Sequence, residues 1–321
     1  MYSFKSVFAG RLASMLEFRA ARGYKRETYL NHYIRFDRYC YGQECENQEL
    51  TSELVHEWLE SEDTSEHAKR ATAIRLFGQY LDAIGETAYI LPNKYATGGK
   101  PRPPYVFTDD EMTALFAAID KLKPTESEPY LNEIAPVLFR LDYTCGLRPN
   151  EGREMLTENV NLDTGEILIT HTKRNKERIV VMSDDMLAMS RDYNLQRGII
   201  GAGNPSFFPS IHGGPLTNEK VYAAFNKAWG MARRTLECPM LKPVSVYSLR
   251  HRFASACLNR WLDDGENLMA MLPYLRAYMG HDKLSETAYY IHILPENLIK
   301  SPGIDWDALN AILPEVIKCP D

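Results

Sequence analysis

The chain has 321 residues and a formal net charge of −6, with 45% hydrophobic and 25% charged residues. This length suits two domains, and the composition is that of an ordinary globular protein. No window approaches the roughly 18 consecutive apolar residues of a membrane span, and the N-terminus lacks the apolar core of a signal peptide. These observations exclude secreted and membrane-spanning classes and predict a cytoplasmic protein.

The six cysteines show no CxxC pairs and no companion histidine spacing, so we expect reduced thiols and no metal site. The acidic net charge argues against a nucleic-acid partner, but the charges are unevenly distributed. Residues 5–38 contain eight basic and three acidic residues, whereas residues 44–66 contain nine acidic residues and no Lys or Arg. This split indicates a basic face and a separate acidic face, or two ordinary solvated helix faces.

The first part of the chain is predicted to be helical. Apolar residues recur at helical spacing, and Gly23 and Gly42 interrupt the pattern. The spacing predicts four helices, over residues 4–21, 27–41, 51–59 and 65–84. The fourth carries a broad apolar face with basic residues interleaved, namely Lys69, Arg70 and Arg75.

Residues 92–104 are rich in Pro and Gly and include Lys100 and Arg102, which predicts an irregular basic linker. We therefore expect a helical domain over residues 1–91, a linker over 92–104 and a second domain over 105–321. After the linker, Thr108 and Glu111 form a capping-box pattern that marks the start of a helix.

An apolar helix is predicted over residues 131–145, ended by Gly146, with Pro149 as the first residue of the next helix. Arg148 then lies beside a helix N-terminus, where free N–H groups favour an anion. The periodicity changes to that of strands at 167–170 and 179–182. This pattern predicts a β-hairpin whose turn carries Lys173, Arg174, Lys176 and Arg178. A further helix is expected after Thr217.

Three short motifs carry the chemistry: Gly-Leu-Arg-Pro-Asn-Glu at 146–151, Leu-Arg-His at 249–251, and Gly-His at 280–281 with Tyr290 nine residues after the histidine. Guanidinium groups hold phosphate oxygens bidentately, a histidine adds a hydrogen bond, and a phenol can act as the nucleophile. In this order and spacing the motifs resemble those of the tyrosine recombinase (phage integrase) family.

The resemblance implies a mainly α, two-domain protein. Its N-terminal part would be a four-helix, SAM-like core-binding domain that clamps DNA. Its C-terminal part would be an α+β catalytic domain of the tyrosine recombinase type with a small antiparallel sheet. The implied catalytic residues are Arg148, Lys173, Arg250, His281 and Tyr290. Tyr289 is the alternative nucleophile and Lys176 the alternative general acid, while Glu151 would orient Arg148.

One residue departs from the family pattern. The position three before the second arginine is commonly His, less often Lys, and here it is Tyr247. A tyrosine donates a hydrogen bond to phosphate but is a poor base at neutral pH. We expect His251, next to Arg250, to pack or to support the site rather than to take over the role of base.

The resemblance also implies a site-specific recombinase acting on double-stranded DNA, of bacterial type and nucleoid-associated. It would form a 3′-phosphotyrosyl intermediate and a Holliday junction as a homotetramer, without metal, ATP or another cofactor. The expected DNA contacts are Lys69, Arg70, Arg75, Lys100, Arg102, Arg174, Lys176 and Arg178. A short apolar helix at 305–316 would dock onto a neighbouring protomer or onto its own domain. The alternatives are a type IB topoisomerase-like nicking-closing enzyme and a catalytically weak, DNA-binding accessory protein.

Overall fold

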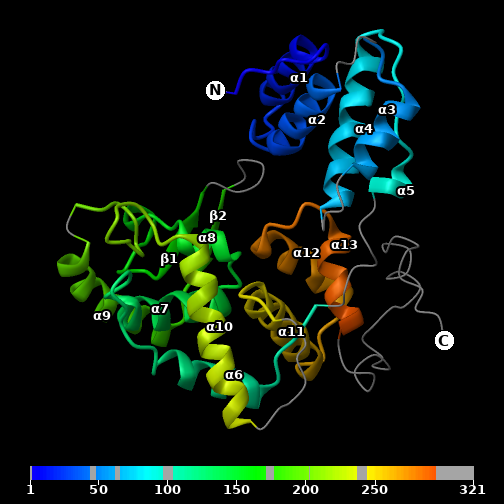
Figure 1. The fold of residues 1–321 in the computed structure, drawn as a ribbon. Helices are drawn as coiled ribbons and strands as arrows, with labels where there is room; N and C mark the ends of the chain where they lie inside the picture. Colours follow the sequence, from blue (N-terminus) through cyan, green and yellow to red (C-terminus); the bar gives the residue numbers. More distant parts are fainter. Residues whose placement is uncertain are drawn as a thin grey trace. The chain divides into compact units, whose positions relative to one another are not determined.

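The computed structural model describes residues 2–43, 48–61, 66–96, 104–170, 177–201, 203–236 and 244–293. The chain divides into two compact units, Met1–Arg102 and Pro103–Asp321 (Figure 1). Each unit has its own hydrophobic core within the described residues, so each is described separately.

The first unit is helical. Its elements are α1 (Ala9–Ala21), α2 (Leu30–Gly42), α3 (Ser52–Glu60), α4 (His67–Ala83) and the short α5 (Asn93–Ala96). The Thr51 side chain caps α3 by accepting a hydrogen bond from the Leu54 N–H at 3.2 Å. Aromatic rings from several helices meet edge to face in the core, among them Phe8, Phe36, Trp58 and Phe77. These four longer helices confirm the four that the periodicity predicts.

The expected irregular linker contains one short helix, α5, and this part of the prediction is wrong. The helix packs against α4. Leu91, just before it, is buried, and Arg75 of α4 donates a hydrogen bond to the Leu91 carbonyl. Contacts with α4 therefore hold the start of this segment in place, although its Pro and Gly content predicts irregular structure.

The second unit is mainly helical with a small sheet, as expected. Its helices are α6 (Asp109–Ile119), α7 (Leu131–Thr144), α8 (Pro149–Arg153), η1 (Thr157–Asn159), α9 (Asp184–Ile200), α10 (Asn218–Thr235), α11 (Tyr247–Asp263), α12 (Leu268–Met279), α13 (Leu284–Ala288) and η2 (Tyr289–Ile293). The predicted capping box is present, with Thr108 and Glu111 bonded to each other's backbone N–H groups. Pro149 begins α8, as predicted.

The sheet is an antiparallel pair formed by β1 (Glu166–Ile169) and β2 (Arg178–Val181). The register pairs Glu166 with Val181 and Ile169 with Arg178. Ile167 and Ile169 of β1 are buried whereas Glu166 and Leu168 are exposed, which is the alternation expected of a strand with one covered face. The hairpin prediction is confirmed, with both strands starting one residue earlier than expected.

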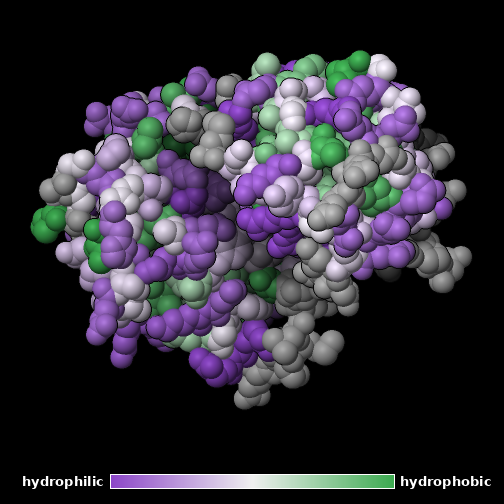
Figure 2. Space-filling model, turned by 45° about the horizontal axis from the view of Figure 1, so that its top comes forward, coloured by the Kyte–Doolittle hydropathy of each residue, from purple (hydrophilic) through white to green (hydrophobic). Residues whose placement is uncertain are grey.

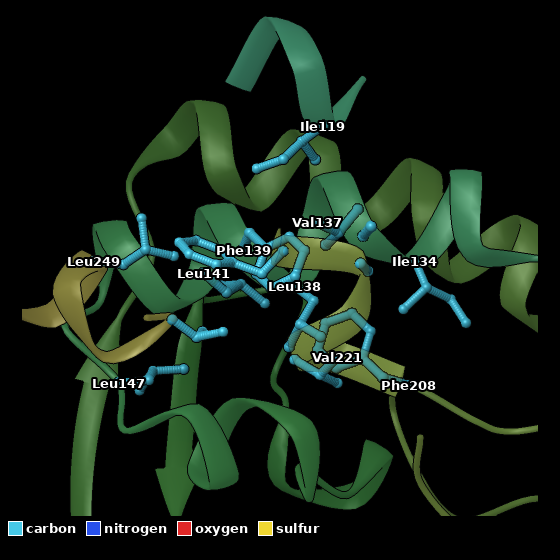
Figure 3. Close-up of a cluster of buried hydrophobic side chains, with 14 of the residues drawn as sticks. Ile119, Ile134, Val137, Leu138, Phe139, Leu141, Leu147, Phe208, Val221 and Leu249 are labelled. Carbon is cyan, nitrogen blue, oxygen red and sulfur yellow. The ribbon is translucent and has the colours of Figure 1, made fainter. Parts of the chain in front are cut away.

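Two residues that directly precede the motif arginines lie in one core. Leu147 and Leu249 are both fully buried and belong to the same hydrophobic cluster (Figure 3). A second cluster, from α11 to η2, includes Met279 and Tyr290. Burial of these neighbours fixes the backbone at all three motifs.

Hydrophilic residues cover most of the face shown in Figure 2, with hydrophobic residues scattered among them. Within the described ranges, no helix is long and apolar enough to cross a bilayer.

Candidate active site

The two motif arginines are held by backbone carbonyls that come from the other motifs. Arg148 donates from Nη2 to the Gly280 carbonyl at 2.8 Å. Arg250 donates from Nη1 to the Gly146 carbonyl at 2.7 Å and from Nη2 to the Met279 carbonyl at 2.6 Å. Segments more than 100 residues apart in the sequence thereby close on one another around two guanidinium groups.

The glycines of these motifs are required by the backbone. Gly146 ends the turn after α7 with φ +59°, and a Cβ there would overlap the ring of Phe253. Gly280 caps α12 with φ +65°, and a Cβ there would lie 3.2 Å from the Arg178 side chain. Both positions combine a left-handed conformation with close packing, which glycine alone satisfies without strain.

Arg250 is fully buried and carries a charge that no hydrogen-bonded carboxylate balances within the described residues. The Glu151 carboxylate lies 3.9 Å from Nη1 of Arg250, and the Nε of Arg250 has no hydrogen-bond partner among the described residues. Burial, with a contribution from Arg148, lowers the pKa of Arg250 to about 10. The group is therefore still cationic at neutral pH and is prepared for an anion.

Glu151 connects Arg148 to Arg178 of β2. Its carboxylate accepts the Arg148 backbone N–H at 2.9 Å and the Arg148 Nη1 at 2.7 Å. Arg178 binds it bidentately, at 3.0 and 2.7 Å, and also donates from Nε to the Tyr278 carbonyl. Burial alone would raise the pKa of Glu151, but Arg178 and Arg148 reverse this and lower it to about 2. The expectation that Glu151 orients Arg148 agrees with this geometry.

Arg178 was expected to contact DNA, and the structure corrects this. Its side chain is only 9% exposed and is engaged by the buried carboxylate of Glu151. The register of β2 explains the difference, because it turns Arg178 toward α8 and α12 instead of the hairpin tip.

Tyr290 lies in the site and is 3% exposed. Its ring stacks on that of His281, with centroids 6.1 Å apart and an interplanar angle of 10°. Burial raises the pKa of Tyr290, and the positive charge of Arg250 partly opposes the increase. The hydroxyl group therefore keeps its proton at neutral pH in the absence of a base.

His281 is also buried, and its Nδ1 lies 2.8 Å from the Thr287 hydroxyl oxygen. Burial lowers its pKa to about 3, with further contributions from Arg250, Arg148 and Arg178. The ring is thus neutral. If Thr287 donates to Nδ1, the other ring nitrogen carries the proton and can donate it to a phosphate oxygen.

His251 is the unexpected member of the site. Its Nδ1 lies 3.0 Å from the Tyr290 hydroxyl oxygen, although the two residues are 39 positions apart. The ring of Tyr247, one helical turn earlier on α11, contacts His251 edge to face at a centroid distance of 4.9 Å. Tyr247 also interacts electrostatically with Arg148. Tyr247, Arg250 and His251 thus occupy one face of α11.

The remaining predicted residues fall into two groups. Lys173, Arg174, Lys176, Lys100, Arg102 and the helix predicted at 305–316 lie outside the described residues. On α4, Lys69 is exposed and pairs with Glu66, whereas Arg75 donates to a backbone carbonyl. Arg70 is fully buried, with its guanidinium over the Trp58 ring and bonded to the Trp58 carbonyl. This burial corrects the expectation that Arg70 contacts DNA.

Sequence reasoning missed three features of the site: the anchoring of Glu151 by Arg178, the contact of Thr287 with His281, and that of His251 with Tyr290. The spacing of Tyr247, Arg250 and His251 at i, i+3 and i+4 indicates a common helix face. No comparable local pattern indicates the contact of Arg178 with Glu151.

Comparisons with known proteins identify the family of the chain and its fold. A sequence model of the phage integrase family matches residues 105–297. Tyrosine recombinase XerD of Rhizobium meliloti (strain 1021) is 28% identical over 257 residues, covering 78% of this chain and 77% of XerD. The XerH site-specific recombinase bound to palindromic difH substrate has a TM-score of 0.63 at 18% identity, covering 88% of this chain and 80% of XerH. A lambda integrase tetramer bound to a Holliday junction has a TM-score of 0.55 at 15% identity, covering 86% of this chain and 78% of that chain. The two structural similarities concern the fold.

Proposed function

Because the chain belongs to the phage integrase family and is a tyrosine recombinase, an enzyme of DNA strand breakage and rejoining, we propose that it forms a 3′-phosphotyrosyl bond through Tyr290. The observation that carries this proposal is the position of the Tyr290 hydroxyl. It is buried beside a fully buried, carbonyl-anchored arginine, and two histidines contact its ring or its oxygen.

The scissile phosphate would bind between Arg148 and Arg250. Arg250 cannot turn away, because two of its nitrogens are held by carbonyls and its side chain is fully buried. Arg148 is 27% exposed and is oriented by Glu151 and Gly280. Fixed donors of this kind stabilise the negative charge that develops on phosphorus oxygens without reorganising during the reaction.

In the cleavage step, the Tyr290 oxygen bonds to phosphorus and the bond from phosphorus to the 5′ oxygen breaks. The leaving oxygen takes a proton from a general acid, for which Lys173 is the prediction and Lys176 the rival. His281 donates a hydrogen bond to a non-bridging oxygen. The phosphotyrosyl bond keeps the energy of the phosphodiester, so rejoining by a 5′-hydroxyl needs no ATP.

The proposed substrate is double-stranded DNA carrying a defined recombination site, and the proposed assembly is a homotetramer that exchanges strands through a Holliday junction. The lambda integrase tetramer on such a junction supports this assembly by shared fold. The alternative is a topoisomerase-like activity. Relaxation of supercoiled plasmids without a defined site, by a monomer, would favour it.

The test uses a nicked suicide DNA duplex and denaturing gels, with Tyr290→Phe and Tyr289→Phe as a matched pair. Each variant removes the hydroxyl group of one of these two adjacent tyrosines. We expect Tyr290→Phe to abolish the covalent adduct with DNA binding retained, and Tyr289→Phe to keep it. If Tyr289→Phe lost the adduct and Tyr290→Phe kept it, the nucleophile would be Tyr289 and the assignment to Tyr290 would be wrong. If EDTA inhibited cleavage and added magnesium restored it, the metal-free mechanism would be contradicted.

A further inference from the structure

We infer that His251 accepts the proton of Tyr290 during strand cleavage and returns it during rejoining. This inference rests on the proposed function and adds the group that removes the phenolic proton. It reverses the expectation from sequence, in which His251 was a packing or supporting residue. It also accounts for an active site in which Tyr247 occupies the position where the family commonly has histidine.

The geometry of the contact carries the inference. The 3.0 Å between His251 Nδ1 and the Tyr290 oxygen is a hydrogen-bond distance. A general base must reach the proton it removes before its basicity matters. Arg250 also interacts with the Tyr290 hydroxyl, but its guanidinium is cationic and has no acceptor, whereas the imidazole of His251 can accept the proton.

The neighbouring groups make the two obvious rivals poorer bases. The ring of His281 lies nearly parallel to that of Tyr290, and its Nδ1 is engaged by Thr287. Tyr247 is itself a phenol, and a neutral phenol oxygen is a poor base for removing the proton of another phenol. Its ring instead packs edge to face on His251 and limits rotation of the imidazole.

The protonation state of His251 fits this role. The ring faces Tyr247 and Arg250 on α11 and Tyr290 on η2. Burial, together with the positive charge of Arg250, lowers its pKa to about 4. The imidazole is therefore neutral at pH 7, so one ring nitrogen can accept. The same shift makes the imidazole a weak base, and a phosphate bound beside Arg250 would supply negative charge that raises this pKa and favours the imidazolium that forms.

The proton balance of the step is complete. As the Tyr290 oxygen bonds to phosphorus, its proton moves to His251 Nδ1 and produces an imidazolium with the other proton on Nε2. The 5′ oxygen leaves and is protonated by the separate general acid. In rejoining, the 5′-hydroxyl attacks phosphorus and gives its proton to the deprotonated general acid, the bond from phosphorus to the Tyr290 oxygen breaks, and His251 returns its proton to that oxygen.

The experiment separates basicity from hydrogen bonding and packing. In His251→Asn the side-chain amide can approach the position of Nδ1 and accept a hydrogen bond, but it cannot take a proton at neutral pH. Since general acid–base groups contribute about 10²–10⁴ in rate, we expect single-turnover cleavage to fall by at least about 10². Thermal unfolding and DNA affinity check that the variant is folded.

A second measurement replaces Tyr290 with a fluorinated, more acidic tyrosine in both the wild type and His251→Asn. If the missing function is proton removal, the more acidic nucleophile should narrow the difference in rate between them. His251→Ala is the second variant, and added imidazole should restore its cleavage in a concentration-dependent manner.

Cleavage by His251→Asn within about threefold of wild type would overturn the inference. So would a rate loss that neither fluorotyrosine nor imidazole relieves, which would assign His251 a packing role. Failure of the wild type itself to form an adduct would instead contradict the proposed function.

Discussion

The two arginines of the site have the same side chain and opposite electrostatic environments. Arg148 is partly exposed and has a carboxylate partner at 2.7 Å, and the charge and hydrogen bond of Glu151 raise its pKa against the effect of burial. Arg250 is fully buried and bonded to two neutral carbonyls, and burial lowers its pKa. The positive charge of Arg250 is therefore only weakly balanced, by the Glu151 carboxylate at 3.9 Å, whereas Arg148 is held in place by a hydrogen-bonded counter-ion.

Replacing each arginine by lysine tests this difference most strongly. Lysine keeps the charge but cannot bridge two separate carbonyls with a planar fork. Loss of a fixed transition-state donor costs about 10²–10³ in rate, so both variants should lose cleavage by about this factor. Arg250→Lys should in addition lower the unfolding free energy by about 1–3 kcal/mol, because buried carbonyls lose their partner. Single-turnover cleavage and urea unfolding measure the two effects. Equal stability losses for Arg148→Lys and Arg250→Lys would remove the distinction.

Glu151→Gln tests the compensated side of the comparison. The folded-state pKa of Glu151 is about 2 against 4.5 for the free group. Its contribution to stability is complete above about pH 4.5 and is lost as the pH falls toward 2, and it amounts to about 3 kcal/mol. Urea unfolding from pH 7 to pH 3 should show a smaller acid-dependent loss in Glu151→Gln than in wild type. The exposed carboxylate of Glu158 provides the control, and Glu158→Gln should leave the slope unchanged.

Asp142 is a second acid, close to Glu151, and its pKa shifts in the opposite direction. It is fully buried, its carboxyl oxygens have no hydrogen-bond partner among the described residues, and Gly152 provides the space beside it. Burial raises its pKa well above 3.8, and Glu151 adds to the increase. Because the folded state holds the proton more tightly, stability is lost as the pH rises above about 4. The free energy of unfolding of the wild type should therefore fall between pH 4 and pH 7. In Asp142→Asn this fall should be smaller by about 1 kcal/mol or more. An unchanged difference between the two pH values would contradict this.

Tyr247→Phe should have the smallest effect. The ring that packs on His251 remains, and only the hydroxyl group near Arg148 is lost. We expect cleavage to fall by less than about tenfold, the equivalent of roughly 1.4 kcal/mol. Tyr247→His should preserve or raise the rate. If Tyr247→Phe were as inactive as Tyr290→Phe, the position would have a catalytic role of its own.

Local signals account for what the sequence predicts well. Thr51, Thr108 and Thr217 mark helix starts because a capping side chain bonds to a backbone group only two or three residues away. The strands follow from alternation within single segments. The motif spacing brings Arg148, Arg250, His281 and Tyr290 to attention because each motif is short and continuous.

The errors concern residues whose surroundings come from elsewhere in the chain. Arg70 has the pattern of a basic residue on a helix, and only the packing of Trp58 from α3 shows that it is buried. Arg178 follows a basic turn, and only the docking of β2 near α8 and α12 gives it Glu151 as a partner. His251 meets Tyr290 through the packing of α11 against η2, which no local spacing encodes.

We propose that Tyr290 forms the covalent bond to DNA between two arginines of different environment. The most direct test is mass spectrometry of the peptide that remains attached to nucleotides after the wild-type protein is trapped on a nicked duplex and digested. We expect a single phosphotyrosyl adduct on Tyr290, joined to a 3′ end and formed at a rate that EDTA does not change. An adduct on Tyr289 or Tyr247, attachment to a 5′ end, or no adduct with DNA that the protein binds would contradict it.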